Sequence, residues 1–446
     1  MSREEYLNWT NKAFDASKIF AKPEALHGIR VLELATLILG PAVPDNLGLL
    51  GAEVIKVELP GAGDTMRSVT PYGTFWKNAS IGQFAQNHSK YHLALDVRVS
   101  QGAEIFRRLA KKCDVVVENL RAGTMDRWGI GYEQLREINP GIIYIALNGF
   151  GQWGEYSVGR ASYDAVAQTV SGLLATTGFP GRLPLKTGVF VGDYFGALQG
   201  TIGVMAALHH RDRTGHGQFI EFSQGEGLMR VLDWSWLYYY LEKYNRPQTG
   251  NRDLAICPSD VFSCQDAPVA VAAASNQEFQ GLCTAMGKPE LAKDARFSTI
   301  SARLKDENAV ALLAIIRDWA KTKTVAEVDA LGSKHGFAAS PILDAKDLYE
   351  SPHMRARATV FEYEDPMYGK MVETCCPAKL CKTPGRIKWA NKPVGLDNDF
   401  VLRKLLGLRT YQLKALAEQK VIGKWVENPP GRKPPADWDG KAGVIM

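Results

Sequence analysis

Short apolar runs alternate with helix-like patterns through the first half of the chain. Each run has the length of one strand, and the segment after it repeats its apolar positions with a helical period. Predicted strands cover residues 29–33, 53–57, 93–96, 114–118, 142–148 and 218–222. Predicted helices cover residues 40–50, 101–111, 132–138, 161–176 and 194–210. Strands that alternate with helices at this spacing predict an α/β domain with a parallel sheet.

The pattern changes after about residue 255, where a predicted strand and three predicted helices are typical of a smaller α+β domain. Two later helices are expected to return to the first domain, and four prolines beyond Trp425 predict an extended tail. The expected parts are an N-terminal extension (1–27), the first part of the large domain (28–225), a linker (226–254), the small domain (255–365), a linker and return to the large domain (366–424) and the Pro-rich tail (425–446).

Composition and charge narrow the classes of ligand. The 446 residues carry a net charge of +5 without a run of basic residues, which favours an anionic ligand over nucleic acid. No apolar stretch has the length of a membrane span, and nothing resembles a signal peptide, so we expect a cytoplasmic protein with no membrane partner. The seven cysteines are not spaced as in a zinc site or a disulfide framework, so we expect free thiols and no metal.

Asp193 is the first candidate for chemistry. It ends an apolar run and directly precedes the predicted helix at 194–210. Aspartate is a frequent N-cap worth about 1 kcal/mol, so a purely structural role is one interpretation. The same position holds a carboxylate against helix amides at a strand-end crevice, which keeps it ionised. An ionised, positioned carboxylate can attack a thioester carbonyl, and the residue pattern leaves both interpretations open.

Two predicted helices carry further signals. The helix after Asp193 contains Gly196, Gly200 and Gly203 nearly on one face. Because glycine costs roughly 1 kcal/mol in a helix interior, this pattern predicts that another element approaches the helix closely. Before the preceding helix, either Ser162 or Asp164 could act as the cap.

Polar residues lie near several predicted strand ends. The first strand–helix turn, at 35–41, lacks the G-x-G-x-x-G fingerprint, which disfavours a hydride-transferring dehydrogenase. Arg67, Lys90 and Arg127 could converge on phosphate groups, for which both side-chain types are suitable donors. Each of them could equally be an ordinary solvated surface charge.

Six segments become specific when they are taken in chain order. They read VLELATLILGPAVPDNLGLLGAEVIKVELP, GAGDTMR, NHSKYHLALD, VVVENLRAGTMDRWGIGYEQLREINPGIIYIALNGFGQ, RASYDAVAQTVSGL and GDYFGALQGTIGVMAALHHRDRTGHGQ. Over residues 28–425 this combination resembles the class III CoA-transferase family, which includes formyl-CoA, carnitine and bile-acid CoA-transferases. The resemblance implies a Rossmann-like parallel-sheet large domain, a smaller α+β domain and an interlocked dimer in which each chain threads through the other.

The resemblance also implies a covalent mechanism with Asp193 as the nucleophile. The aspartate attacks a donor acyl-CoA and forms a mixed anhydride, which releases CoA thiolate. The thiolate returns and forms an aspartyl-CoA thioester. The acceptor carboxylate then attacks, and CoA is transferred through a second anhydride.

CoA and acyl-CoA are expected to enter as substrates, with no tightly bound cofactor. Tyr163 matches a substrate-site tyrosine of the family, and Leu59 replaces an arginine that some members use at the nucleotide. A glycine-rich loop that covers the active site in the formyl-CoA branch is not visible near residues 250–262. The positions that match CoA contacts are Thr36, Leu37, Arg67, Lys90, Asn119, Leu120, Arg127 and Trp128.

Two other functions remain open. An α-methylacyl-CoA racemase of this fold has a histidine where this chain has Tyr163, and tyrosine, with a pKa near ~10, is a poorer base at neutral pH. A non-catalytic subunit is also possible because some members pair unlike chains, although the presence of Asp193 favours the active role. The partner is therefore a second copy of the chain or a related subunit.

The acceptor acid is suggested by an aromatic cluster at residues 231–240. Aromatic residues at helical spacing are typical of a core, but at a site they would suit a bulky or aromatic acid such as benzylsuccinate. Succinyl-CoA, a common donor in the family, is the expected donor.

Overall fold

A computed structural model describes most of the chain. It covers residues 1–77, 79–157 and 159–424. The predicted Pro-rich tail at 425–446 lies outside these described residues, so its extended form stays a prediction.

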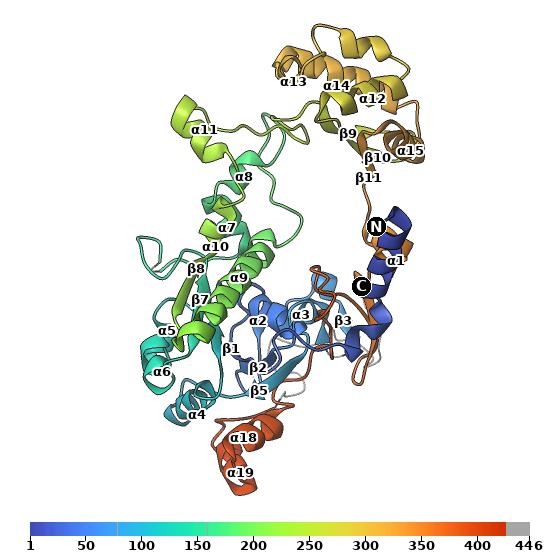
Figure 1. The fold of residues 1–446 in the computed structure, drawn as a ribbon. Coiled ribbons are helices and arrows are strands. Elements are labelled where there is room, and N and C mark those ends of the chain that lie inside the picture. Colours follow the sequence, from blue (N-terminus) through green and yellow to red (C-terminus); the bar gives the residue numbers. More distant parts are fainter. Residues whose placement is uncertain (78, 158, 425–446) are drawn as a thin grey trace. The chain divides into compact units, whose positions relative to one another are not determined.

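The chain divides into two compact units (Figure 1). The boundaries differ from the expected ones: residues 352–365, which the sequence assigned to the small domain, belong to the first unit. The first unit comprises residues 1–173, 187–233 and the described residues from 352 onward, and the second comprises residues 174–186 and 234–351.

The first unit is built on a six-stranded sheet with the order β5-β2-β1-β6-β7-β8, in which every neighbouring pair is parallel. This is the strand order of a doubly wound sheet, whose crevice lies outside the carboxyl ends of the strands where the order reverses, here between β1 and β6. The predicted α/β class with a parallel sheet is confirmed. The strands are β1 (Arg30–Leu34), β2 (Glu53–Glu58), β5 (Lys90–Ala94), β6 (Val115–Glu118), β7 (Ile143–Asn148) and β8 (Phe219–Ser223).

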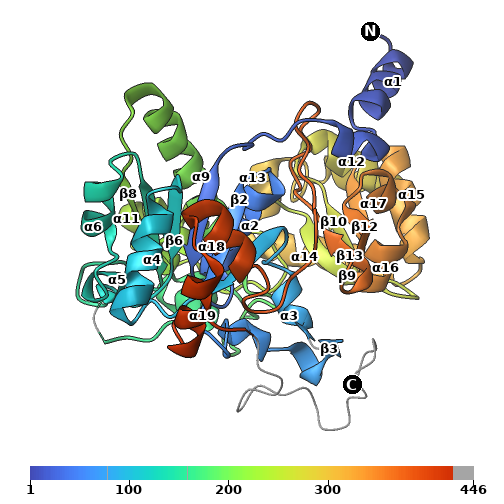
Figure 2. The ribbon, with the colours of Figure 1, turned by 90° about the horizontal axis from the view of Figure 1, so that it is seen from below.

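Helices cover both faces of this sheet. Successive strand residues point to opposite faces, so Val31 packs in one apolar core and Leu32 in the other. Figure 2 shows α4 and α18, both from the second face, next to each other. The first face is covered by α2 (Leu39–Leu49) and α9 (Val191–Thr214), and the second by α4 (Ser100–Ala110), α6 (Tyr132–Ile138), α18 (Asn398–Leu406) and α19 (Thr410–Glu418).

Helix α9 packs closely against α2 because glycines remove side chains from its contact face. A Cβ atom on Gly196 would lie 2.9 Å from Leu39 Cδ1, and one on Gly200 would lie 3.1 Å from Val43 Cγ2. The predicted close approach is confirmed at these two positions, whereas Gly203 has ordinary spacing, 3.5 Å, to its nearest neighbour Ile220. The contact brings the first turn of α2 to the first turns of α9.

Shorter elements complete the first unit. β12 and β13 form an antiparallel hairpin, as do β3 and β4. The elements are α1 (Arg3–Ala13), η1 (Ala16–Ala21), η2 (Thr65–Arg67), η3 (Pro71–Gly73), β3 (Phe75–Trp76), β4 (Ala79–Ser80), α3 (Ile81–Phe84), α5 (Thr124–Arg127), α7 (Asp164–Val170), α8 (Leu173–Thr176, at the unit boundary), α10 (Gln224–Met229), α17 (Pro352–Ala356), β12 (Val360–Asp365) and β13 (Gly369–Thr374).

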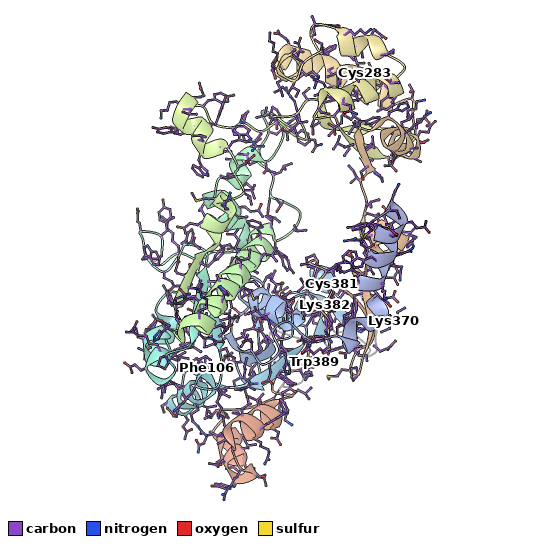
Figure 3. The ribbon with its side chains drawn as sticks, in the orientation of Figure 1. Phe106, Cys283, Lys370, Cys381, Lys382 and Trp389 are labelled. Atoms are coloured by element: carbon purple, nitrogen blue, oxygen red, sulfur yellow. The ribbon has the colours of Figure 1, made fainter. Side chains whose placement is uncertain are left out.

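The second unit is a small α+β body with three antiparallel strands in the order β11-β10-β9. Its apolar core contains Cys283 (Figure 3). The buried Arg303 donates to the carbonyl oxygens of Cys257 and Phe297, at 2.8 Å each, so backbone dipoles replace the water around its charge. The elements are α11 (Ser235–Glu242), β9 (Ser259–Ser263), β10 (Pro268–Ala272), α12 (Asn276–Ala285), η4 (Pro289–Lys293), α13 (Ile300–Leu304), α14 (Asp306–Ala320), α15 (Val325–His335), β11 (Ala338–Pro341) and α16 (Ala345–Glu350).

Two helices near the candidate site differ from their predicted ends. The helix predicted at 194–210 spans Val191–Thr214, so Asp193 lies inside its first turn. The helix predicted at 161–176 is interrupted after α7, where Gly172 has a φ of +86°. That left-handed conformation cannot continue an α-helix, so α7 ends before it and α8 begins after it.

Among the described residues, none of the helices is both long and apolar enough to cross a membrane. The same residues contain no group of three or more His, Cys, Asp or Glu side chains that could hold a metal ion. All seven cysteines are free thiols. The cytoplasmic location stays a prediction.

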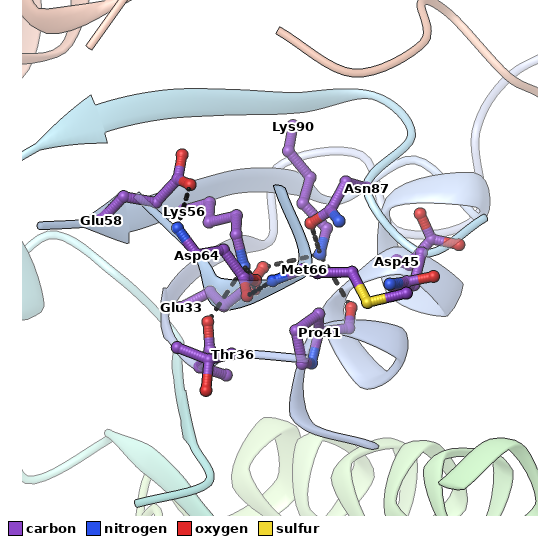
Figure 4. A network of polar contacts seen from close by, with 12 residues as sticks. Glu33, Thr36, Pro41, Asp45, Lys56, Glu58, Asp64, Met66, Asn87 and Lys90 are labelled. Carbon is purple, nitrogen blue, oxygen red and sulfur yellow. Dashed lines mark hydrogen bonds and ion pairs between the residues drawn. The ribbon is translucent and has the colours of Figure 1, made fainter. Parts of the chain in front are cut away.

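A network of charged side chains from β1, β2, β5 and the turn at Asp64 is buried inside the first unit (Figure 4). The Lys56 Nζ atom lies 2.6 Å from Glu33 Oε1 and 2.9 Å from Asp64 Oδ2. The Lys90 Nζ atom lies 2.8 Å from Glu33 Oε2. Burying an ion costs several kcal/mol unless it is paired, so each cation requires its carboxylates.

The network continues through Glu58, which accepts two hydrogen bonds of 2.7 Å from Arg67. His92 Nδ1 lies 2.7 Å from the same carboxylate. Burial lowers the pKa of His92 to about 4, so the ring is neutral near pH 7. Burial also opposes the ionisation of Glu58, but Arg67 and His92 outweigh it and hold its pKa well below the ordinary range.

These buried cations hold residues 35–41, called here the first-turn loop, which comprise the loop after β1 and the first three residues of α2. Lys56 donates to the carbonyl oxygen of Ala35 at 3.0 Å. Lys90 donates to that of Pro41 at 2.8 Å. The first-turn loop is therefore anchored at both of its ends by charged side chains from β2 and β5.

We expect Lys56→Met to destabilise the first unit strongly. The methionine fills a similar volume but leaves Glu33 and Asp64 without their shared cation, and removing one partner of a buried pair costs about 3–5 kcal/mol. Chemical unfolding monitored by circular dichroism gives the difference. Lys321→Met is the matched control, because the Lys321–Asp318 pair is exposed and such pairs contribute little. Equal unfolding midpoints for the two variants would contradict this account of the network.

Candidate active site

Asp193 is the third residue of α9, not its N-cap as the sequence suggested. The N-cap is Phe190, which offers no side-chain acceptor. The Asp193 carboxylate still lies in the first turn, where the helix dipole favours negative charge. The predicted helix-terminal setting therefore holds, although the capping role does not.

Asp164 supplies the acceptor that α9 lacks. Its Oδ1 atom accepts a 2.7 Å hydrogen bond from the backbone N–H of Gly192, and its Oδ2 atom accepts one of 2.6 Å from Gln168 Nε2. Asp164 is the first residue of α7 and is buried. It therefore caps the neighbouring helix α9. The sequence had suggested Asp164 as a candidate cap of its own helix, α7, and it does not have that role.

The Asp193 carboxylate has two hydrogen-bond donors from other elements. Gln224 Nε2, at the start of α10, donates to Asp193 Oδ1 at 2.8 Å. The backbone of Leu39, at the start of α2, provides a second hydrogen bond. Helix α10 begins directly after β8, and α2 begins after the turn that follows β1. Both donors therefore lie at the carboxyl ends of strands, where doubly wound sheets bind their ligands.

Two opposing effects set the proton affinity of Asp193. Burial of the partly exposed carboxyl group and the nearby charge of Asp164 raise its pKa, while Gln224 and Leu39 lower it. The result is a pKa of about 7, well above the ordinary value of 3.8. A carboxylate in this range is ionised in a large fraction of molecules near neutral pH and is more basic than an ordinary aspartate, which suits a nucleophile.

Gly192 leaves room for this arrangement. A Cβ atom at this position would lie 3.1 Å from Asp164 Oδ1 and 3.3 Å from Gln224 Nε2. Both side chains therefore approach the backbone at the residue before Asp193. This crowding gives a physical reason for the Gly-Asp pair that the sequence singled out.

Tyr163 is the N-cap residue of α7, and its side chain is exposed. Because the next residue, Asp164, accepts a hydrogen bond from Gly192, the backbone at Tyr163 lies near the start of α9.

Sequence reasoning missed Gln224. Its signal was its place two residues after the predicted strand at 218–222, the same strand-end rule that drew attention to other polar residues.

A cavity of about 180 Å³ lies at the carboxyl ends of β1 and β2. Three of the residues predicted to contact CoA line it, namely Thr36, Leu120 and Trp128. Its other lining residues are Leu34, Ala35, Val57, Glu58, Leu59, Gly63, Asp64, Leu95, Asp96, Val97 and Arg98. The lining is mainly apolar, and its one cation, Arg98, is paired with Asp96 at 2.7 Å, so the cavity suits a flat, uncharged group.

Asn119 and Leu37 support the first-turn loop. Asn119 accepts from the Thr36 N–H at 2.9 Å and donates to the Thr36 carbonyl oxygen at 2.8 Å. Leu37 has a φ of +66°, which is costly for a residue with a side chain. Its N–H donates to Asp64 Oδ1 at 2.9 Å, and its carbonyl oxygen accepts from Gln86 Nε2 at 3.1 Å, so both polar groups are held in place.

The three predicted phosphate-binding cations lie in different settings. Arg67 and Lys90 are enclosed in the buried network, with their charges on carboxylates. Arg127 is exposed on α5, where it donates to Thr124 Oγ1 at 2.9 Å. Only the guanidinium of Arg127 among these three is open to solvent, and contacts of all three with phosphate stay predictions.

The sequence of the chain also matches a known protein family. The model of CoA-transferase family III matches residues 26–398. The chain belongs to this family. The resemblance inferred from the sequence motifs is therefore confirmed, and so is the prediction of an enzyme with CoA-transferase activity.

Members of the family resemble the chain over most of its length. Succinyl-CoA–D-citramalate CoA-transferase of Chloroflexus aurantiacus is 34% identical over 401 residues, which are 90% of this chain and 98% of that protein. The alpha subunit of succinyl-CoA–L-malate CoA-transferase of Chloroflexus aurantiacus is 32% identical over 399 residues, 89% of this chain and 92% of that one. A solved CAIB/BAIF family protein from Brucella suis has a TM-score of 0.76 at 32% identity, covering 86% of this chain and 100% of that chain.

We expect Asp193→Asn to become more stable than the unsubstituted protein as pH rises. The folded-state pKa of about 7 exceeds the ordinary 3.8, so stability that is present below pH 4 is lost as pH rises toward 7. Asparagine has nearly the same shape as aspartate but does not ionise, so the variant does not lose this stability as pH rises. After discounting for partial exposure, the difference at pH 8 is on the order of 2 kcal/mol. Urea unfolding of both proteins at pH 4.5 and 8 measures it. A difference that does not change with pH would contradict the raised pKa.

We expect Asp164→Asn to lower the pKa of Asp193 below about 7, because it removes the nearby negative charge. Infrared difference titration of the carboxyl band, with Asp193→Asn as the reference, reports that pKa. Glu226→Gln is the control, since Glu226 is exposed on the same helix as Gln224. A pKa that moves equally in both variants, or rises in Asp164→Asn, would show that Asp164 is not the source of the shift.

Proposed function

We propose that the enzyme transfers CoA from succinyl-CoA to a C4 or C5 dicarboxylic acid through covalent intermediates on Asp193. The observation that carries this proposal is the Asp193 carboxylate itself, held by Gln224 and Leu39 in the first turn of α9 with a pKa of about 7. A carboxylate nucleophile suits CoA transfer between two carboxylic acids, because the anhydride and thioester that it forms are both activated acyl groups.

The proposed reaction begins when Asp193 attacks the thioester carbonyl of the donor. The C–S bond breaks, CoA thiolate leaves, and a succinyl-aspartyl anhydride remains. The thiolate attacks the Asp193 Cγ atom and releases succinate, which leaves an aspartyl-CoA thioester. The acceptor carboxylate attacks the same carbon and displaces the thiolate, which leaves an anhydride between the acceptor and Asp193. The thiolate then attacks the acceptor carbonyl of this anhydride, forms the product acyl-CoA and frees Asp193. Electrons and atoms balance without hydrolysis at any step.

We propose that CoA occupies the cavity at the carboxyl ends of β1 and β2. We assign its adenine to the apolar surface between Leu120 and Trp128, and the start of its path to Thr36. The exposed Arg127 then serves the phosphates. Lys90 and Arg67 act indirectly in this proposal. Lys90 donates to the Pro41 carbonyl oxygen in the first-turn loop, and Arg67 holds Glu58, which lines the cavity. Tyr163, beside Asp164, is the proposed contact to the acyl group.

The acceptor is proposed from the relatives and not from the aromatic cluster. The names of the citramalate and malate transferases give small hydroxylated dicarboxylic acids as their acceptors. The aromatic side chains of α11 are exposed in the second unit, for example Trp236 and Tyr240. The relatives' names give no support to benzylsuccinate, the acceptor that the sequence suggested, so it enters the same assay as a contrast.

The interlocked dimer stays part of the proposal. Because this chain carries Asp193, we propose that it is a catalytic chain, in a homodimer or beside a related subunit. The similarity to an alpha subunit keeps the second arrangement open to test. Analytical ultracentrifugation of the chain expressed alone distinguishes them, since a heteromer-only chain would neither dimerise nor turn over substrate.

We expect Asp193→Ala to lower CoA transfer by at least a factor of about 10³, the scale on which nucleophile removal acts. The assay mixes succinyl-CoA with citramalate, malate, glutarate, acetate or benzylsuccinate and follows the new thioester. Hydroxylamine should trap the activated carboxyl of Asp193 as a hydroxamate visible by mass spectrometry of its peptide. Asp212→Ala is the control, since Asp212 is an exposed aspartate of the same helix.

Three outcomes would contradict the proposal. Full transfer by Asp193→Ala would exclude the covalent role. Solvent deuterium entering the α-carbon of an acyl-CoA without CoA exchange would indicate a racemase. Transfer to benzylsuccinate but not to the small dicarboxylic acids would reverse the choice of acceptor.

A further inference from the structure

Gln224 is a buried amide side chain next to the nucleophile. It is the first residue of α10 and directly follows β8. Its side chain is 3% exposed, and its Nε2 atom lies 2.8 Å from Asp193 Oδ1. A carboxylate oxygen only accepts hydrogen bonds, so the amide nitrogen of Gln224 must face it.

The position of this amide is fixed from several directions. The Ser223 side chain caps α10 by accepting from the Glu226 N–H, and the Gly225 N–H donates to the Gly149 carbonyl oxygen at 3.2 Å. On the other side, the backbone of Gly192 lies so close that a Cβ atom there would meet the amide at 3.3 Å. Gln224 is therefore pre-organised to donate toward Asp193.

We propose that Gln224 is a catalytic residue, the oxyanion donor for the tetrahedral intermediates that form on the carbonyl carbon of Asp193 itself. This inference rests on the proposed function, because those intermediates exist only if Asp193 is acylated. It concerns the middle steps of the reaction, in which the enzyme's own carbonyl group is attacked.

The chemistry of those steps places charge on the atom that Gln224 contacts. When Oδ2 forms the bond to the donor acyl group, Oδ1 becomes the carbonyl oxygen of the aspartyl anhydride. CoA thiolate attacks Cγ, the C=O electron pair moves to Oδ1, and a tetrahedral intermediate forms. The pair then returns as the bond between Cγ and Oδ2 breaks and succinate leaves with Oδ2. When the acceptor carboxylate later attacks the thioester, Oδ1 again carries the negative charge of a tetrahedral intermediate. The C=O bond then re-forms, and CoA thiolate leaves.

The energetic effect is greatest in the transition state. In the anhydride and in the thioester, Oδ1 is a neutral carbonyl oxygen, and it gains a full negative charge in the tetrahedral intermediate. A hydrogen bond that strengthens on this change accelerates the reaction, whereas one of equal strength in both states does not. Removing one such donor from other acyl-transfer enzymes slows them by about 10²–10³.

The first and last steps depend on Gln224 differently. There the tetrahedral carbon belongs to the donor or acceptor acyl group, so its oxyanion is not Oδ1. Gln224 then acts on the free carboxylate and lowers the pKa of Asp193. Loss of Gln224 therefore raises that pKa, but this effect disappears at pH 9, where Asp193 is ionised in either case.

The test compares Gln224→Leu with Gln199→Leu at pH 9. Gln199 of α9 donates to the Gly227 carbonyl oxygen of α10 at 3.0 Å, so it joins the same two helices without touching Asp193. For Gln224→Leu we expect a 10²–10³-fold lower kcat and a larger fraction of enzyme carrying the aspartyl adduct in the steady state, trapped by hydroxylamine. For Gln199→Leu we expect no change in that fraction.

Several results would overturn the inference. One is a kcat for Gln224→Leu within threefold of the unsubstituted enzyme at pH 9. Another is an unchanged trapped fraction despite a lower kcat, which would mean that Gln224 supports only the fold. If the unsubstituted enzyme shows no adduct on Asp193 at all, the proposed function itself is wrong, and that failure is recognisable before any variant is made.

Discussion

The pairing of buried charges on β1, β2 and β5 is the constraint on which the site depends. Lys56 and Lys90 cannot stay charged without water unless Glu33 and Asp64 neutralise them. Once paired, their remaining N–H groups have to find acceptors. They find them in the carbonyl oxygens of the first-turn loop, so the requirement to satisfy a buried ion also determines the path of the chain after β1.

The same loop connects this network to Asp193, the proposed nucleophile. It leads into α2, whose first residue, Leu39, supplies a backbone hydrogen bond to Asp193. The glycines of α9 allow that helix to lie close enough for this bond. Asn119 joins the loop to the end of β6, so the part of the chain that lines the cavity and the part that holds Asp193 belong to one continuous scaffold.

The site itself keeps a group in an unfavourable environment. Asp193 lies near the charge of Asp164 and is partly withdrawn from water, which raises its pKa and makes its ionised form costly. Asp164 cannot be removed without consequence, because it caps α9 through Gly192. The helix end thus uses the Asp164 carboxylate for stability and holds Asp193, the proposed nucleophile, and the charge of Asp164 raises the pKa of Asp193. Active sites commonly accept such a loss of stability for function.

The sequence by itself determined the parallel sheet and the close contact at Gly196 and Gly200, and its motifs indicated the family and Asp193. These follow from local periodicity, from the absence of side chains and from residue order, which need no knowledge of distant contacts. Only the tertiary structure decided that Lys90 is buried against Glu33, that Asp164 caps α9 and that Gln224 meets Asp193. Each of these joins residues on different elements. Whether a polar side chain is solvated, paired or catalytic depends on what the fold places opposite it, and no local pattern records that partner.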